Sequence, residues 1–373
     1  MENLRAVMKA LSFRIRVIGL GLGLILGLQM IAYGQSAVAT NGSAAQLKSS
    51  DVIRLMINAR SLSSTEAETL EQKLVADPKD LQSRITLLSH YSFGKDPAVR
   101  LKKDEHALWF IKNVPDAEFL HWIYQVRLDP IIDARFNEAK QAWLSNLETY
   151  KGNLIVLSNA TDFFLITDPE LAEKLIKQGA AADPQNPQWP GELGAIYTNQ
   201  THRATGEMRR SLASKAYQQF ETAYHLSRNG SERRMWISPL MTAAFEAGDS
   251  AKAQVWAQEA LNQKSTSTDS SIADAAHHAH IILGRIALTS NDVAGAREQL
   301  LLAGQVSGSP VLGSFGPNMT LAKELLEKGE RETVVKYFEE CALFWKKDQG
   351  KLAEWTAAVK NGDVPKFGPN LIY

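Results

Sequence analysis

The sequence predicts an all-α fold in which pairs of helices stack into a solenoid, and three observations lead to this class. Groups of residues recur at fixed offsets in units of roughly 34 to 43 residues, a period typical of stacked supersecondary units. From position 51 onward, apolar residues fall at helical spacing almost throughout the chain. Alternating β-branched runs with hairpin signals are absent, so no sheet is expected.

The recurring offsets are clearest in two pairs of segments. A proline with partners nine, ten and thirteen positions later occurs twice, as Pro78-Leu87-Leu88-Tyr91 and as Pro184-Leu193-Gly194-Tyr197. A longer pattern also occurs twice, as Leu240, Ala244, Asp249, Ala253, Ala257, Ala260 and as Leu283, Ala287, Asp292, Ala296, Leu300, Ala303. The small residues in these patterns let two helices approach closely. One such pair cannot bury its apolar face alone, so several pairs must stack.

Residues 1–39 have the composition of a secretory signal peptide. Four basic residues precede an apolar run over residues 17–32, and small-residue exit sites end at Gly34 and Ala39. An uncleaved membrane anchor is the alternative, because roughly 17–25 apolar residues can span a bilayer. Residues 40–50 are rich in Ser, Ala and Asn and are expected to form a linker. We therefore expect an exported protein, periplasmic or secreted, which meets a membrane only through this segment if it stays uncleaved.

The composition narrows the classes of function. Of the 373 residues, 45% are hydrophobic and 22% are charged, which suits a folded protein. Lys+Arg and Asp+Glu balance at 41 each, so nothing indicates a nucleic-acid partner. Cys341 is the single cysteine, which excludes an internal disulfide framework and a four-thiolate zinc site.

Helix pairs are expected in order along residues 51–348. Residues 47–80, 81–119 and 120–152 fit as degenerate units, and better-matched units begin at residues 153, 187, 234, 277 and 315. The first three units carry on their second helices Ala107, Ala139 and Trp143. Asp77-Pro78 and Asp183-Pro184 should each end a helix, because the residue before a proline is pushed out of the α region. Residues 198–214 are expected to lengthen a loop or a helix, and residues 307–318 to form a glycine-rich connection.

The C-terminal residues 349–373 are expected to cap the array, since a terminal repeat has no neighbour on its outer side. Residues 352–360 should form one further helix with Trp355 and Val359 on its buried face. Residues 367–373 should run extended against the last helices, because Phe367 and Tyr373 make this segment too apolar for a free tail. The Phe-Gly-Pro-Asn sequence of residues 315–318 recurs at 367–370, and each phenylalanine is expected to fill a gap at the end of the solenoid.

These units resemble the tetratricopeptide repeat (TPR), most strongly over residues 153–304. Residues at the family's positions are Ala160, Phe163, Asp168, Ala172, Gly179 and Pro184 in one unit, and Leu193, Gly194, Tyr197, Ala216, Phe220 and Ala223 in the next. The resemblance implies a right-handed α-solenoid of seven or eight helix pairs. It also implies a protein or peptide partner in the concave groove.

The family's groove is lined by positions 2, 5, 9 and 12 of each first helix. Carried over, these positions are Leu154, Leu157, Thr161, Phe164, Met235, Ser238, Thr242, Phe245, His278, Ile281, Arg285, Leu288, Lys323 and Leu326. The family's clamp for a terminal carboxylate is not matched, because Arg285 and Lys323 are the only basic candidates. The groove is instead apolar and aromatic, which suits an amphipathic helix or the chain's own flanking segment. The alternative is that these residues pack within the solenoid.

The search for catalytic chemistry finds little. His277 and His280 lie one helical turn apart with Asp274 a turn earlier, but no second ligand pair accompanies them, so no metal and no cofactor are expected. No nucleophile elbow, phosphate loop or His-Glu-x-x-His motif is present. We therefore expect a non-enzymatic scaffold or adaptor for another exported protein. The alternative is an enzyme or small-ligand-binding protein that uses residues 198–214 and 307–318 over a pocket.

Overall fold

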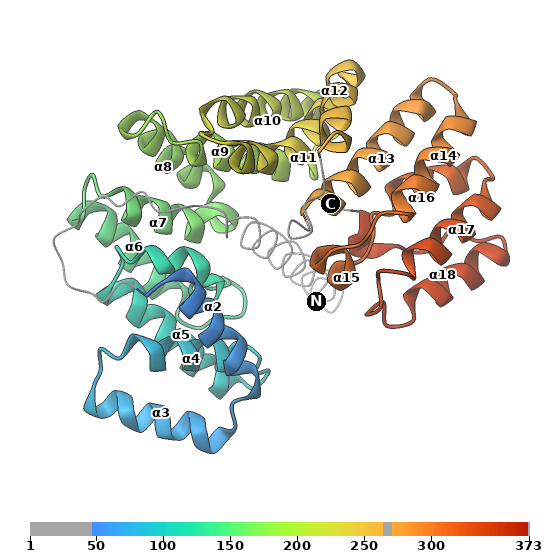
Figure 1. Cartoon of the computed structure of the whole chain (residues 1–373). Helices are drawn as coiled ribbons and strands as arrows, with labels where there is room; N and C mark the ends of the chain where they lie inside the picture. Colours follow the sequence, from blue (N-terminus) through green and yellow to red (C-terminus); the bar gives the residue numbers. More distant parts are fainter. Residues whose placement is uncertain (1–46, 264–270, 372–373) are drawn as a thin grey trace, which may run out of the picture. The chain divides into compact units, whose positions relative to one another are not determined.

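The computed structural model describes residues 47–263 and 271–371, and this part of the chain is all-α (Figure 1). It contains seventeen α-helices, about 75% of it is helical, and none of it is a β-strand. Neighbouring helices in the sequence pack against one another in adjacent pairs, which is compatible with a helical repeat. The all-α class predicted from the sequence is confirmed. The predicted signal peptide lies outside the described residues.

The contacts within the chain form two compact units that divide between Gln185 and Asn186. Each unit has its own buried residues, and each is described by itself. Residues 47–185 are called the N-terminal unit below, and residues 186–371 the C-terminal unit.

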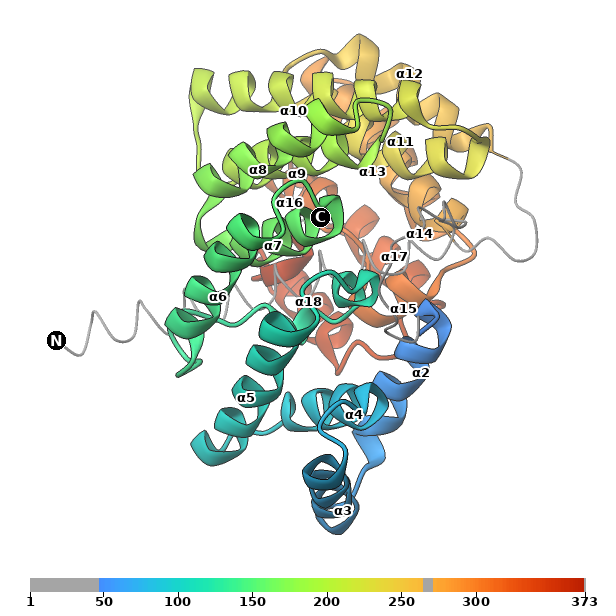
Figure 2. The same ribbon diagram turned by 90° about the vertical axis from the view of Figure 1, so that its left-hand side faces the viewer.

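The N-terminal unit is a succession of helices in which each α-helix from α3 onward packs on the next. In addition, α2 packs on α4, and Figure 2 shows these two helices side by side. The elements are α2 (Ser49–Asn58), η2 (Ala59–Ser61), α3 (Ser64–Ala76), α4 (Leu81–Tyr91), α5 (Pro97–Asn113), η3 (Glu118–Trp122), η4 (Tyr124–Val126), α6 (Phe136–Thr149), α7 (Leu154–Thr167) and α8 (Pro169–Ala182). The two Asp-Pro steps end helices as predicted, because α3 stops at Ala76 and α8 at Ala182.

The unit predicted over residues 120–152 has only its second helix, α6, so the expected first helix is wrong. Residues 114–135 instead form the short 3-10 turns η3 and η4 and a loop. A buried charge centre holds this loop: Lys103 Nζ lies 2.5 Å from an Asp133 oxygen and 3.3 Å from an Asp104 oxygen. Asp104 also accepts a hydrogen bond from the backbone N–H of Arg135, directly before α6. The loop therefore combines local backbone hydrogen bonds with these polar contacts to α5.

The C-terminal unit continues the pairing and ends in an extra helix. Its elements are α9 (Gln188–Thr201), α10 (Gly206–Leu226), α11 (Gly230–Glu246), α12 (Ser250–Leu261), α13 (Ser271–Thr289), α14 (Val293–Gly304), α15 (Pro310–Phe315), α16 (Thr320–Glu327), α17 (Arg331–Cys341), α18 (Lys351–Lys360) and η5 (Gly368–Leu371). Figure 1 shows α13, α14, α16, α17 and α18 running alongside one another. The first helices α11, α13 and α16 are neighbours, as are the second helices α14 and α17.

The small residues of the pattern lie where two helices of a pair meet. Gly194 of α9 and Ala253 of α12 are buried, and the ring of Phe220 from α10 covers Gly194. A Cβ atom at position 194 would lie 2.7 Å from that ring, so the glycine sets the approach of the two helices.

Two connections of the C-terminal unit take helical form. The segment 198–214 lengthens the end of α9 and the start of α10, which is one of the two forms expected for it. The segment 307–318, expected to be a glycine-rich connection, contains the six-residue helix α15, with Ser309 as its N-cap and Pro310 at its first position.

The C-terminal end is closed as the sequence suggested. Helix α18 buries Trp355 and Val359, and Phe367 beyond it is 2% exposed. Residues 368–371 form the turn η5 rather than an extended strand, and Tyr373 lies outside the described residues.

Candidate functional site

The residues predicted to line a groove divide between the two units. On α7 of the N-terminal unit, Leu154 and Leu157 are half-buried, whereas Thr161 and Phe164 are buried in the core. The other predicted residues lie in the C-terminal unit, on α11, α13 and α16. The predicted residues of each unit are therefore considered separately.

In the C-terminal unit most of the predicted positions are partly accessible. The half-buried ones are Met235, Ser238, Thr242, Phe245, His278, Arg285 and Leu288. Lys323 is exposed and pairs with Glu327 one turn later on α16. Ile281 and Leu326 belong to the core, with exposed fractions of 1% and 3%.

Arg285 connects three successive first helices. Its guanidinium lies 4.4 Å from the ring centroid of Phe245 on α11, and Nε donates to Glu324 of α16 at 2.9 Å. One of its terminal nitrogens is 3.6 Å from an oxygen of Glu246 on α11. Beside them, Thr242 Oγ1 and His278 Nε2 are 3.3 Å apart across α11 and α13. We call the surface formed by Thr242, Phe245, Glu246, His278, Arg285 and Glu324 the Arg285 face.

The Glu246 carboxylate lies between two guanidinium groups. Arg209 of α10 donates to it at 2.6 Å, and Arg209 also donates to the carbonyl of Thr201 at the end of α9. A chain of paired charges thus runs from Arg209 of α10 through Glu246 of α11 and Arg285 of α13 to Glu324 of α16. With Arg209 included, two guanidinium groups face two carboxylates, so the charges balance.

Burial governs how the groups of this face titrate. Burial raises the pKa of Glu324, although the neighbouring Arg285 acts to lower it. Burial, together with the nearby Arg285, lowers the pKa of His278 to about 4, so this imidazole is neutral at physiological pH. Burial, and to a smaller extent repulsion from Arg209, lowers the pKa of His202, which lies beside this face.

Sequence analysis identified Thr242, Phe245, His278 and Arg285 as groove positions but missed Glu246 and Glu324. Each of the two carboxylates lies 39 positions from Arg285, one before it and one after it. That distance falls within the repeat period of roughly 34 to 43 residues. Opposite charges at equivalent positions of successive units could therefore have predicted these ion pairs.

The histidine cluster has a structural role in this chain. His277 is 2% exposed, and its Nδ1 lies 2.9 Å from the carbonyl oxygen of Ala303. Its Nε2 accepts the backbone N–H of Asn318 at 3.0 Å, so the ring is neutral with its proton on Nδ1. His280 Nδ1 lies 2.9 Å from the Gln299 amide oxygen. Over residues 47–263 and 271–371, no group of three His, Cys, Asp or Glu side chains is placed to hold a metal ion.

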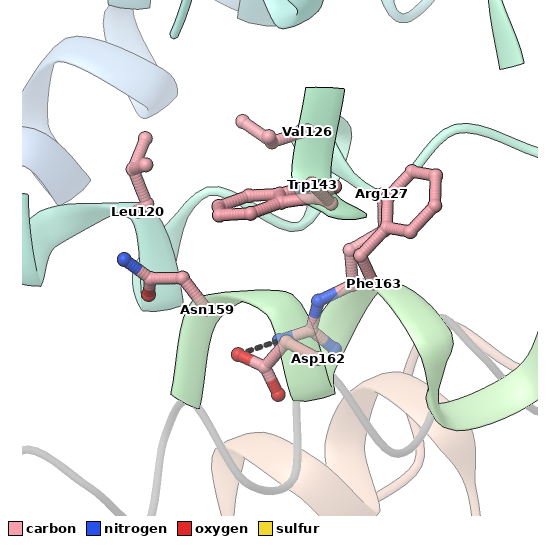
Figure 3. A pocket seen from close by; sticks show the side chains of 7 residues that line it. All are labelled: Leu120, Val126, Arg127, Trp143, Asn159, Asp162 and Phe163. Atoms are coloured by element: carbon pink, nitrogen blue, oxygen red, sulfur yellow. Dashed lines mark ion pairs between the residues drawn. The ribbon is translucent and has the colours of Figure 1, made fainter. Parts of the chain in front are cut away.

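One small cavity lies in the N-terminal unit, among η3, η4, α6 and α7 (Figure 3). Its volume is about 10 Å³, which is room for a single water molecule. The Asp162 carboxylate at its edge pairs with Arg127 at 2.9 Å and with His121 at 2.8 Å. Burial acts to raise the pKa of Asp162, but these two partners outweigh it and hold the pKa below its usual value. The site is an ion-pair centre with no room for a larger ligand.

A larger, open hollow of about 360 Å³ lies on α10 and α12. Its lining residues are Tyr224, Val255, Trp256, Gln258, Glu259 and Asn262. Neither this hollow nor the small cavity is lined by residues 198–214 or 307–318, the two segments considered for a ligand pocket.

Within the described ranges, every helix is too short or too polar to cross a membrane. No model of a known protein family matches the chain, and a comparison with curated proteins finds no relative.

Proposed function

We propose that this chain is a non-enzymatic, exported scaffold or adaptor, built as a right-handed solenoid of TPR-like helix pairs, that binds a protein partner on its Arg285 face. The packing of helices in adjacent pairs supports the repeat assignment. The recurrence of small residues at the pair interfaces, such as Gly194 and Ala253, supports it as well.

The observation that carries the proposal is the bridge that Arg285 makes across α11, α13 and α16. The bridge holds three first helices at a fixed spacing, which gives a rigid surface for recognition. Because the Arg285 guanidinium already faces Glu246 and Glu324, it is not available to clamp a terminal carboxylate. Half-buried apolar side chains lie on the same helices as this bridge, among them Phe245 and Met235 of α11 and Leu288 of α13. We therefore propose that the partner presents an internal amphipathic helix rather than a chain end.

Site-specific photocrosslinking tests this proposal. Benzoylphenylalanine at position 288 on α13 should capture one or a few discrete partners in cells that export the protein. The matched control is the same label at Val255 on α12, which is 65% exposed and lies outside the Arg285 face. The Phe245→Ala variant should reduce the capture from position 288. Equal capture at positions 288 and 255, or no capture at 288, would contradict the proposal.

The alternative, an enzyme or a small-ligand-binding protein, makes a different prediction. A specific metabolite would then raise the melting temperature in a thermal-shift screen, and substitutions at Phe245 and Arg285 would leave that shift unchanged. Measuring both responses on the same variants separates the two classes of function.

A further inference from the structure

The two Phe-Gly-Pro-Asn segments of the C-terminal unit contact each other directly. The Asn370 side-chain amide donates to the carbonyl oxygens of Phe315 at 3.1 Å and Pro317 at 2.9 Å. In return, the backbone N–H of Met319 donates to the carbonyl oxygen of Asn370 at 2.8 Å. The second copy of the motif is thus bound by the main chain at the first copy.

The phenylalanine of the second copy is anchored in an aromatic pocket. Its ring centroid lies 5.0 Å from that of Trp355 and 6.2 Å from that of Phe338, both in edge-to-face geometry. Phe367 is 2% exposed and Asn370 is 1% exposed. The tail is therefore held at two points, an aromatic anchor and a fully buried amide.

The receiving surface is held in place by elements other than the tail. Tyr337 of α17 donates its hydroxyl to the carbonyl of Asn318, and His277 of α13 accepts the N–H of Asn318. Gly316 has a φ of 87°, and a Cβ atom there would lie 2.4 Å from the indole of Trp345. The backbone that presents the Phe315 and Pro317 carbonyls is thus positioned by α13, α17 and Trp345.

The tail is joined to α18 by a segment that is largely exposed. Residues 361–364 and Lys366 are exposed, and Pro365 is buried. Arg331 donates to the carbonyls of Gly362 and Asp363, and both hydrogen bonds are exposed to solvent. This segment is a tether rather than part of the core.

We propose that the surface around Phe338, Trp355 and the 315–319 main chain is a peptide-binding site for Phe-Gly-Pro-Asn segments. The C-terminal tail is its displaceable ligand, and the tail of a second copy of this chain fits it equally because the sequence is identical. This site is independent of the Arg285 face, and either proposal can fail without the other.

The chemistry of the contact defines what the site accepts. Asn370 must donate two hydrogen bonds to carbonyl oxygens, which aspartate cannot do although its shape is nearly the same. Gly368 has a φ of 57°, a conformation that other residues rarely adopt. The site thus requires an aromatic residue, a glycine directly after it and an asparagine two positions after the glycine.

Cleavage after folding tests whether the tail is a separable ligand. A site for a sequence-specific protease is inserted between Asp363 and Val364 of the full chain, and the folded protein is cut there. We expect the released 364–373 peptide to stay bound during gel filtration and to exchange with an excess of labelled synthetic peptide. A peptide with Asn370→Asp should bind on the order of tenfold or more weakly, because the aspartate cannot donate to the carbonyls of Phe315 and Pro317. Unfolding on cleavage, loss of the peptide without rebinding, or equal binding of both peptides would overturn the proposal.

Shortening the tether tests exchange between two copies. Deleting residues 362–364 should prevent the tail from reaching its own site and so convert the protein to a dimer, as measured by analytical ultracentrifugation. The same deletion combined with Asn370→Asp should be monomeric. A monomeric deletion variant, or a dimer that persists with Asn370→Asp, would show that tails are not exchanged.

Discussion

At the scale of single residues, glycine at position 194 sets how closely α9 and α10 pack. We expect Gly194→Ala to lower the free energy of unfolding by roughly 1–3 kcal/mol, because the added methyl group overlaps the Phe220 ring. The matched control is Gly230→Ala at the start of α11, where the nearest atom is 3.8 Å away, in the Arg234 side chain. Urea denaturation of both variants measures the difference. Equal stabilities would show that the helix pair can absorb the methyl group by moving.

A second residue-scale prediction concerns pH. Burial lowers the pKa of His277 to about 4 in the folded protein, against about 6.5 when unfolded. The stability that the neutral ring contributes is therefore complete above pH 6.5 and lost as the pH falls from 6.5 through 4. His277→Gln keeps a donor for Ala303 and an acceptor for Asn318 but has no proton to gain. Between pH 7 and 4 the unfolding free energy of this variant should fall by about 3 kcal/mol less than that of the wild type. Parallel pH dependences would contradict this role of His277.

Only part of the Arg285 face could be predicted from the sequence. Arg285 was identified because it occupies a groove position in the repeat. Its partners Glu246 and Glu324 were not, because each sits on another helix, one repeat period away. Burial of Phe164 and Ile281 was equally hidden. Helical spacing marks the inner face of a helix, whereas the depth of burial on that face depends on how the next helix lies.

At the scale of elements, the loop between α5 and α6 depends on a buried lysine. Burial and then the charge of Asp133 raise the pKa of Asp104, and Lys103 acts to lower it. Lys103→Met should cost roughly 3–5 kcal/mol at neutral pH, because two buried carboxylates lose their counter-charge. The cost should shrink at acidic pH, because the raised pKa of Asp104 means that this carboxyl then gains a proton and no longer needs a counter-charge.

Thermal unfolding at pH 7 and pH 4.5 measures this change, and the Lys103→Met/Asp133→Asn double variant is the control. The double variant should recover part of the lost stability, since one carboxylate is then neutral. A cost for Lys103→Met that does not depend on pH would mean that lost packing, rather than charge, is responsible.

Each error in the secondary structure expected from the sequence has a physical cause. Residues 120–135 have apolar spacing that suits a helix, but the contacts that hold them come from Lys103 and Asp104, far away in the sequence. Helix α15 had a local signal, because Ser309 and Pro310 are residues favoured at the N-cap and at the first helical position. The glycines that follow obscured it. By contrast, the Asp-Pro helix ends and the helix 351–360 depend on local chemistry and were found.

At the scale of the whole molecule, each of the two units has its own buried core. Residues 186–373 contain two large apolar clusters, one centred on α11 and one on α17. We expect residues 186–373, expressed alone, to show a helical circular dichroism spectrum and one cooperative thermal transition. The fragment of residues 47–185, expressed alone, is measured in the same way for comparison. A non-cooperative transition of the 186–373 fragment would show that its core depends on the N-terminal unit.

The closure of the C-terminal end by Phe367 has a consequence for how the protein behaves at high concentration. Stacked repeats present at their last member the same kind of surface that joins the inner members, so an open end invites another molecule to continue the array. With the tail in place, Phe367 packs against the rings of Phe338 and Trp355, so we expect this end not to bind a further molecule. The C-terminal tail of each molecule would thus end its own array of helix pairs.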